Sequence, residues 1–159
     1  GGRNIHWLLH QGFDVTALDA NPEAIEFLRT NYPKHPNRFH LSTLENFPSD
    51  TSYDFIICNA VLHFARNHAH FDAMFDRLAD LLAPEGYLFI RMTSEIGLEG
   101  HLGPAPNGVY DLPDGSIRYL LTRPKVDLLL QKHGLHLQGH VKTVLVERLR
   151  SMTTLVLRK

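Results

Sequence analysis

Asp19 is the residue whose position in this sequence most clearly suggests chemistry. It follows a short apolar run, residues 15–18, whose composition suits a buried strand. A helix start comes directly after it, with Asn21 as the cap and Pro22 and Glu23 in the first turn. The carboxylate is thus expected at the carboxyl end of a strand, the edge of an open α/β sheet where ligands bind. There it can accept hydrogen bonds from both vicinal hydroxyls of a ribose.

The alternative for Asp19 is an acid that only complements the dipole of the following helix. We favour ribose binding because Asn21 already serves as the helix cap.

The 11 histidines raise the question of a metal site. Two pairs could each supply half of one: His6 with His10, and His68 with His70. Neither pair is accompanied by an HExxH pattern or by a cluster of cysteines. We therefore predict no metal site, and we expect most histidines to be neutral side chains at or near the surface.

The elements that must position these residues alternate between strand and helix. Helices are expected at residues 4–11, 22–32, 71–82 and 123–133, and strands at residues 14–18, 39–41, 53–58, 87–90, 135–147 and 152–157. No helix separates the last two strands, so they should pair antiparallel. The pattern predicts an α/β fold with a doubly wound, mostly parallel sheet, helices on both faces and a C-terminal antiparallel hairpin.

Residues 97–115 interrupt this alternation, with five glycines, three prolines and no clear period. A loop of this length inside a compact domain is usually functional or mobile. We predict an irregular loop near the substrate site. Beyond it, Arg148, Arg150 and Lys159 are expected on the solvated edge of the final hairpin.

Length and composition favour one domain, because 159 residues with 43% hydrophobic content can bury a real core. Sixteen basic and 17 acidic side chains give a charge of −1, which offers no support for a nucleic-acid partner or an anionic membrane. The single cysteine, Cys58, excludes an internal disulfide and is expected to be buried. The chain has neither a run of about 18 apolar residues nor a signal peptide, so we expect a soluble cytoplasmic protein of unknown oligomeric state.

The order of elements resembles that of the class I S-adenosylmethionine-dependent methyltransferases over essentially the whole chain. Gly1 and Gly2 look like the end of the family's glycine-rich loop, where missing side chains let the backbone approach the cofactor. Asp19 stands 17 residues after Gly2, where the family places the acid that binds the ribose hydroxyls. The resemblance implies S-adenosylmethionine as cofactor, S-adenosylhomocysteine as product, and Gly1, Gly2, Asp19 and Ala20 as cofactor contacts.

Further segments carry the same resemblance. Residues 42–48, with the aromatic-Asp pair at 53–54, look like the family's turn against the adenine, which implies contacts from Thr43 and Leu44, although an Asp is usual where Thr43 stands. Residues 59–64 match the segment that leaves the fourth strand beside the cofactor, which implies Asn59 and Ala60 as contacts. Residues 81–88 resemble the family's Leu-x-Pro-Gly-Gly turn, with Glu85 in place of the first glycine.

His63 is the candidate catalytic residue, since the resemblance places it near the transferred methyl group and facing the substrate. A histidine can titrate near neutral pH, so it could act as general base toward a hydroxyl or a protonated amine. The alternative is a residue that only shapes the pocket, because methyl transfer from a sulfonium depends chiefly on positioning and desolvation.

Arg91, Arg118 and Tyr119 are predicted substrate contacts. An arginine suits a carboxylate or phosphate on the acceptor. The alternative for both arginines is a solvated surface charge.

These features predict methyl transfer from S-adenosylmethionine to a small-molecule acceptor. The opening GGRN and the small size resemble the tellurite-resistance-type subgroup. One alternative, a nicotinamide-dependent Rossmann oxidoreductase, shares the glycine loop and the ribose acid but does not explain the terminal antiparallel pair. A second alternative is a non-catalytic domain with the methyltransferase fold, because the family's central first strand is missing; we expect instead that the sequence is an incomplete record of a longer protein.

Overall fold

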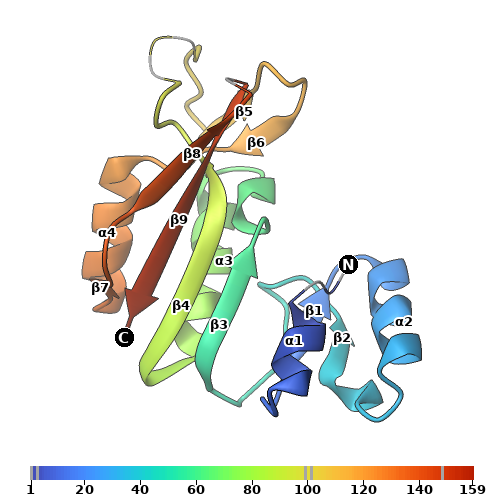
Figure 1. The fold of residues 1–159 in the computed structure, drawn as a ribbon. Coiled ribbons are helices and arrows are strands. Elements are labelled where there is room, and N and C mark those ends of the chain that lie inside the picture. Colours follow the sequence, from blue (N-terminus) through green and yellow to red (C-terminus); the bar gives the residue numbers. More distant parts are fainter. Residues whose placement is uncertain (1, 3, 99, 101, 148) are drawn as a thin grey trace. The chain divides into compact units, whose positions relative to one another are not determined.

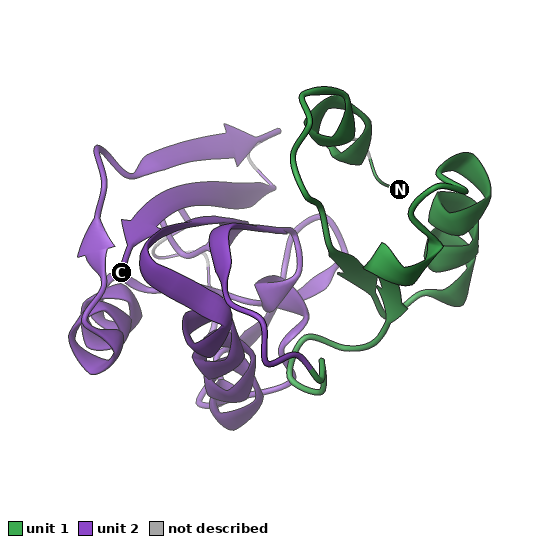
Figure 2. Cartoon of the chain, turned by 90° about the horizontal axis from the view of Figure 1, so that it is seen from below, with its two compact units in different colours: residues 1–48 green, residues 49–159 purple. Residues whose placement is uncertain are grey.

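The chain forms two compact units, Gly1–Pro48 and Ser49–Lys159, which Figure 2 shows in different colours. The computed structural model describes residues 2, 4–98, 100, 102–147 and 149–159. The single domain that the composition favours stays a prediction. Among the described residues, no helix has the length and apolar character that crossing a membrane requires.

Unit 1, Gly1–Pro48, is built around two parallel strands with a helix in the connection between them. In chain order its elements are α1 (Ile5–His10), β1 (Ala17–Asp19), α2 (Pro22–Asn31), the 3-10 helix η1 (Pro36–Arg38) and β2 (Phe39–Leu41) (Figure 1). The Asn21 side chain accepts a hydrogen bond of 2.9 Å from the Glu23 N–H, so α2 begins where the sequence predicts. The core of the unit consists of Ile25, Leu28 and Phe39, with Ile5, Ala17 and Tyr32 packed against them.

Unit 2, Ser49–Lys159, contains a mixed sheet. Its elements are β3 (Tyr53–Asn59), the 3-10 helix η2 (Leu62–Phe64), α3 (His68–Leu81), β4 (Leu82–Ser94), β5 (Val109–Asp111), β6 (Ile117–Tyr119), α4 (Arg123–His133), β7 (His136–Leu137), β8 (Lys142–Val146) and β9 (Arg150–Arg158). β3 pairs in parallel with β4, whereas β9 is antiparallel to β4, β7 and β8. The fold is α/β, but a mostly parallel sheet is not confirmed.

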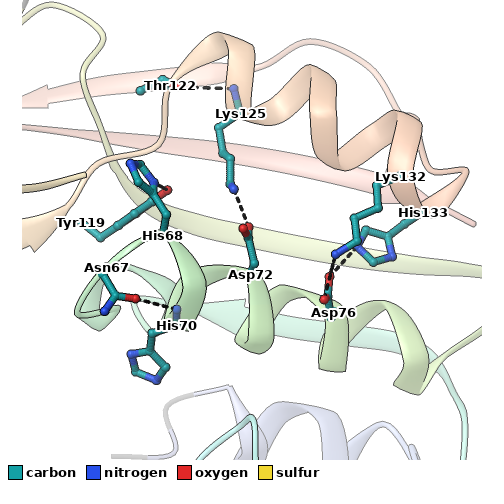
Figure 3. Close-up of polar contacts among 10 residues, drawn as sticks. All are labelled: Asn67, His68, His70, Asp72, Asp76, Tyr119, Thr122, Lys125, Lys132 and His133. Atoms are coloured by element: carbon teal, nitrogen blue, oxygen red, sulfur yellow. Dashed lines mark hydrogen bonds and ion pairs between the residues drawn. The ribbon is translucent and has the colours of Figure 1, made fainter. Parts of the chain in front are cut away.

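Helices α3 and α4 lie on the same face of the unit 2 sheet (Figures 1 and 2). Figure 3 shows how the two helices are joined: Asp72 pairs with Lys125, and Asp76 lies 2.6 Å from the Lys132 amine and 2.9 Å from the His133 ring. Elsewhere on this sheet, Phe55 and its register partner Tyr87 are exposed by 51% and 40%. Helices on both faces are therefore not seen within unit 2 by itself.

The C-terminal part of unit 2 matches the sequence prediction most closely. α4 spans the predicted residues because the Thr122 side chain caps its start and Gly134, at φ 62°, ends it in the left-handed conformation. The predicted antiparallel hairpin is present as β8 and β9. The single strand predicted at 135–147 is divided into β7 and β8, because Gly139 between them has a φ of 72°.

Two expectations about unit 2 need correction, and a third is confirmed. The segment 97–115 is not wholly irregular, since Val109–Asp111 forms β5 and pairs antiparallel with β6. Lys159 is not on a solvated edge, because its amine donates to the carbonyls of Ala79 and Leu82 at 2.7 and 2.8 Å and so binds the end of α3. Cys58 is buried as predicted, and burial raises the pKa of its thiol to about 12.

Glu85 replaces the first glycine of the expected Pro-Gly-Gly turn, and its backbone conformation shows that this replacement is unfavourable. Its φ is +64°, a left-handed conformation that a residue with a Cβ adopts at a cost of about 1–2 kcal/mol. The next residue, Gly86, cannot carry a side chain, because an added Cβ would lie 2.8 Å from the Ala83 carbonyl oxygen. The turn thus needs glycine at both positions and has it at one, while the Glu85 carboxylate forms an exposed ion pair with Arg158.

We predict that Glu85→Gly raises the free energy of unfolding by about 1 kcal/mol, measured by urea denaturation. The backbone strain is relieved, and the exposed ion pair that is lost contributes little. Glu85→Ala is the matched control, because it loses the same ion pair but keeps the strain, and it should be no more stable than the original chain. Equal stabilities for the glycine and alanine variants would contradict the argument.

Candidate functional site

In unit 1, the predicted ribose acid lies at the carboxyl ends of both parallel strands. Asp19 ends β1, and it is opposite Leu41, the last residue of β2. The Ser42 N–H donates to the Asp19 carbonyl at 3.1 Å, which holds the segment after β2 against the end of β1. The Asp19 carboxylate accepts a hydrogen bond of 2.9 Å from the Asn21 N–H, so its orientation is fixed by the same turn that starts α2.

The turn after β2 brings Thr43 and Leu44 to the same edge. The Thr43 hydroxyl accepts a hydrogen bond of 2.9 Å from the Asn46 side chain, and the Thr43 carbonyl accepts one of 2.8 Å from Ser42. Leu44 is buried, and its carbonyl accepts from the Phe47 N–H at 3.3 Å. Leu44 therefore anchors the turn with its side chain, so only its backbone remains available to a ligand.

Gly2 has a clear structural reason to be glycine. Its φ is +68°, and an added Cβ would lie 2.6 Å from a methyl carbon of Leu28 on α2. The close approach that this glycine permits is therefore first of all to its own chain. Gly1, the other predicted glycine, and Arg3 lie outside the described residues. Ala20, also predicted, is exposed directly after β1.

In unit 2, the predicted residues gather where β3 and β4 end. Asn59 ends β3 beside its register partner Arg91 of β4. Ala60 follows with a φ of +59°, and its N–H donates to the Arg91 carbonyl at 2.8 Å. Strained non-glycine residues of this kind are concentrated at functional sites, so Ala60 supports the choice of this edge. The backbone then enters η2, which carries His63.

His63 is 6% exposed, and its Nδ1 has no hydrogen-bond partner in the described part of the chain. Burial, followed by the positive charges of Arg118, Arg150 and Arg91, lowers its pKa from 6.5 to about 4. The expectation that His63 titrates near neutral pH is therefore wrong. The ring is neutral at pH 7, and as a general base it would be weak in the free protein.

The Phe64 ring contacts both Arg118 and His63. The Arg118 guanidinium carbon lies 4.8 Å from the centroid of the Phe64 ring, and the Phe64 and His63 rings meet edge to face with their centroids 4.6 Å apart. Arg91 is half-buried in β4, opposite Asn59 at the end of β3. Arg91 and Arg118 both act electrostatically on His63.

Tyr119 lies in the core rather than at a surface. It is 1% exposed, its ring stacks on Phe71 at 4.4 Å, and its hydroxyl is 2.9 Å from Nδ1 of His68 (Figure 3). Burial raises the pKa of Tyr119 to about 12. Nothing in this environment supports the predicted substrate contact, and the position is explained by packing.

Arg150 is the residue of this neighbourhood that the sequence analysis assigned elsewhere. It is half-buried at the start of β9, its Nη1 lies 3.2 Å from the Asp114 carboxylate, and its Nε is buried without a partner in the described residues. Arg150 joins this neighbourhood because β9 pairs with β4. The pairing of these strands cannot be deduced from the sequence directly. Across the described residues, no three or more His, Cys, Asp or Glu side chains are gathered as a metal site would need.

Comparison with known protein families distinguishes the methyltransferase interpretation from the oxidoreductase interpretation. Residues 1–90 match the family model described as methyltransferase domain. The chain belongs to this methyltransferase family. The resemblance to class I S-adenosylmethionine-dependent methyltransferases is thereby confirmed, and a nicotinamide-dependent oxidoreductase loses its support.

Several solved structures have a fold similar to that of this methyltransferase. One is an S-adenosylmethionine-dependent methyltransferase from Methanosarcina mazei, with 19% identity, coverage of 99% of this chain and 87% of that chain, and a TM-score of 0.77. Another is the 1,6-didemethyltoxoflavin-N1-methyltransferase of Burkholderia thailandensis, with 20% identity, coverage of 99% and 66%, and a TM-score of 0.70. The N-methyltransferase NodS from Bradyrhizobium japonicum WM9 has 13% identity, coverage of 91% and 65%, and a TM-score of 0.63. At these identities the likeness shows the fold, an α/β fold similar to Rossmann-like methyltransferases.

We predict that acid destabilises the methyltransferase through His63. Its pKa is about 4 when folded and 6.5 in the unfolded chain, so the unfolded state binds the extra proton. The free energy of unfolding should therefore fall as the pH drops from 6.5 to 4, by up to about 1.4 kcal/mol per pH unit. Urea denaturation across this range measures the slope, and His63→Gln should flatten it.

His136→Gln, which removes an exposed histidine of β7, is the control and should leave the slope unchanged. Asp76 and Asp114 also have lowered pKa values, so their own losses begin only at about pH 5 and occur equally in the original chain and in His63→Gln. An unchanged slope in His63→Gln would contradict the assignment.

Proposed function

We propose that this chain transfers a methyl group from S-adenosylmethionine to a small-molecule acceptor. One observation carries the proposal: in a member of a methyltransferase family, the Asp19 carboxylate stands at the carboxyl end of β1, beside the end of β2. That edge of parallel strands is where α/β proteins bind nucleotide-like ligands.

The Asp19 carboxylate fits the ribose of the cofactor. The side chain is half-buried, so it is accessible yet partly shielded from water. A carboxylate offers about four acceptor positions on its two oxygens. The hydrogen bond from the Asn21 N–H occupies one of them and orients the group, which leaves capacity for both ribose hydroxyls.

The other proposed cofactor contacts are assigned by the resemblance. They are Gly1, Gly2, Ala20, Thr43, Leu44, Asn59 and Ala60. Since the Thr43 hydroxyl already accepts from Asn46, we assign adenine recognition at this turn chiefly to backbone groups. When bound, S-adenosylmethionine supplies an electrophilic methyl group and leaves as S-adenosylhomocysteine.

His63, Arg91 and Arg118 are proposed to face the acceptor. The His63 ring is neutral at pH 7, so the lone pair of its unprotonated nitrogen can receive a proton from an acceptor hydroxyl or ammonium. With a pKa of about 4, His63 is poorly matched to the role of general base. We favour a role as a buried side chain that lines the acceptor site, orients the acceptor and excludes water. Tyr119 is proposed to act only by supporting Arg118, its neighbour in β6.

Two similar structures support the cofactor and the acceptor class. The Burkholderia thailandensis protein is described with bound 1,6-didemethyltoxoflavin and S-adenosylhomocysteine, and NodS is described in complex with S-adenosylhomocysteine. A doubly wound, mostly parallel sheet and the tellurite-resistance-type subgroup stay part of the proposal. Unit 1 by itself contains a parallel strand pair with α2 in its connection, and unit 2 by itself contains another with α3 in its connection.

We predict that Asp19→Asn weakens S-adenosylhomocysteine binding by about tenfold to a hundredfold in isothermal titration calorimetry. The reason is that hydrogen bonds to a charged acceptor contribute about 1.5–3 kcal/mol, and an amide replaces one acceptor oxygen with a donor. Asp14→Asn is the control, since Asp14 is an exposed acid shortly before β1 that pairs with Arg38 at 2.7 Å.

The same titrations distinguish the alternatives. Binding of S-adenosylhomocysteine by the original chain with no loss in Asp19→Asn would contradict the ribose assignment. Binding of NADH in its place would restore the oxidoreductase. Binding of S-adenosylhomocysteine with no transfer of labelled methyl to any tested acceptor would favour the non-catalytic binding domain.

A further inference from the structure

Three arginines from separate elements of unit 2 act on the same buried histidine. Arg118 belongs to β6, Arg91 to β4 and Arg150 to the start of β9. All three are half-buried, and each lowers the pKa of His63 by electrostatic repulsion. We call these three residues the arginine cluster. Half-burying several cations around one neutral ring is unfavourable unless an anion compensates them.

The compensation within unit 2 is incomplete. Asp114, on the turn between β5 and β6, lies 3.2 Å from Arg150 and also acts electrostatically on Arg118. Asp114 is itself committed to the N–H of Ser116 at 3.0 Å. Among the described residues, Asp114 pairs with Arg150 and acts on Arg118, and the side chains that act electrostatically on His63 are all positive. Positive charge therefore predominates around His63.

Two buried nitrogen atoms at this place have no partner among the described residues. One is Nδ1 of His63, in a side chain 6% exposed, and the other is Nε of Arg150. Buried polar atoms are normally hydrogen-bonded, so two unsatisfied ones beside uncompensated charge indicate a ligand. The Arg118 guanidinium is already placed over the Phe64 ring at 4.8 Å, and Phe64 is 58% exposed, so the cluster is open to solvent at this side.

We propose that the arginine cluster binds a carboxylate or phosphate group of the methyl acceptor, with His63 beside the bound anion. This inference rests on the proposed methyl transfer for the identity of the ligand as acceptor. Guanidinium groups bind both anions through paired N–H donors, and both share the charge that the cluster lacks. Arg91 is the register partner of Asn59, and its carbonyl accepts from the Ala60 N–H, so the anion would be bound near the carboxyl end of β3.

The test follows the pKa of His63 by NMR titration of the histidine side chains, with His63→Gln to assign the signal. Titrations are run in inorganic phosphate, in acetate and in chloride at equal ionic strength. An anion bound beside the imidazole should raise the pKa of His63 by about 1 or more relative to chloride. A response to phosphate alone indicates a phosphorylated acceptor, and a response to acetate alone indicates a carboxylic acid.

Three variants sharpen the result. Arg118→Gln should abolish the effect of the anion, and Arg118→Lys should retain part of it because the charge remains without the paired donors. Asp114→Asn should strengthen anion binding, since it removes the competing carboxylate. Arg123→Gln is the control, because Arg123 is an exposed arginine of α4 that pairs with Asp127.

The inference is overturned if the pKa of His63 is the same in all three salts, or if Arg118→Gln responds to the anions like the original chain. Calorimetry with S-adenosylhomocysteine on the same samples separates this from the proposed function. Cofactor binding without an anion response refutes only the arginine cluster as the acceptor site. An anion response without cofactor binding leaves the anion site and refutes methyl transfer.

Discussion

Ala60 leaves β3 in a left-handed backbone conformation, and the hydrogen bond from its N–H to the Arg91 carbonyl holds it there. The conformation costs an alanine about 1–2 kcal/mol, so the turn persists because β4 and the buried residues beyond it determine its path. Its effect is to end β3 abruptly and turn the chain into η2. Leu62 and His63 are thereby buried, while Asn59, just before the turn, stays exposed. The edge of unit 2 that is proposed to face the substrate depends on this one turn.

Unit 1 reaches a comparable arrangement without left-handed strain at the strand end. Asp19 uses its backbone carbonyl to accept from Ser42 and its carboxylate to accept from Asn21, so one residue ties the end of β1 both to the segment after β2 and to the start of α2. A side chain that is already held by a hydrogen bond, on a backbone that is also fixed, loses less freedom when it binds a ligand. The helix start that looked like a competing explanation for this acid is therefore what orients it.

Local chemistry decided what the sequence could predict. α4 was predicted to the residue because Thr122 and Gly134 act on their own neighbours. The end of the first strand was predicted at Leu18, one residue before β1 ends at Asp19. Side-chain environments that arise from strand pairing were not predictable. Tyr119 is buried only because β6 packs beside η2 and β4, and Arg150 joins His63 only because β9 pairs with β4. Arg91 and Arg118 were thus predicted from the sequence, while the burial of Tyr119 and the contribution of Arg150 had to be seen in the structure.

The charge around His63 also limits how the residue can take part in methyl transfer. Burial, together with the cations around it, keeps the His63 ring neutral and makes it a weak base, so proton acceptance and positive surroundings oppose each other. An anion that neutralises Arg118 and Arg91 relieves the opposition, and by linkage a protonated His63 must tighten the anion by the same factor that the anion raises its basicity. Base strength would then appear only with the acceptor in place. The same geometry is therefore compatible with both states of the enzyme. In the free enzyme His63 is a weak base, and in the complex with the acceptor it can accept a proton.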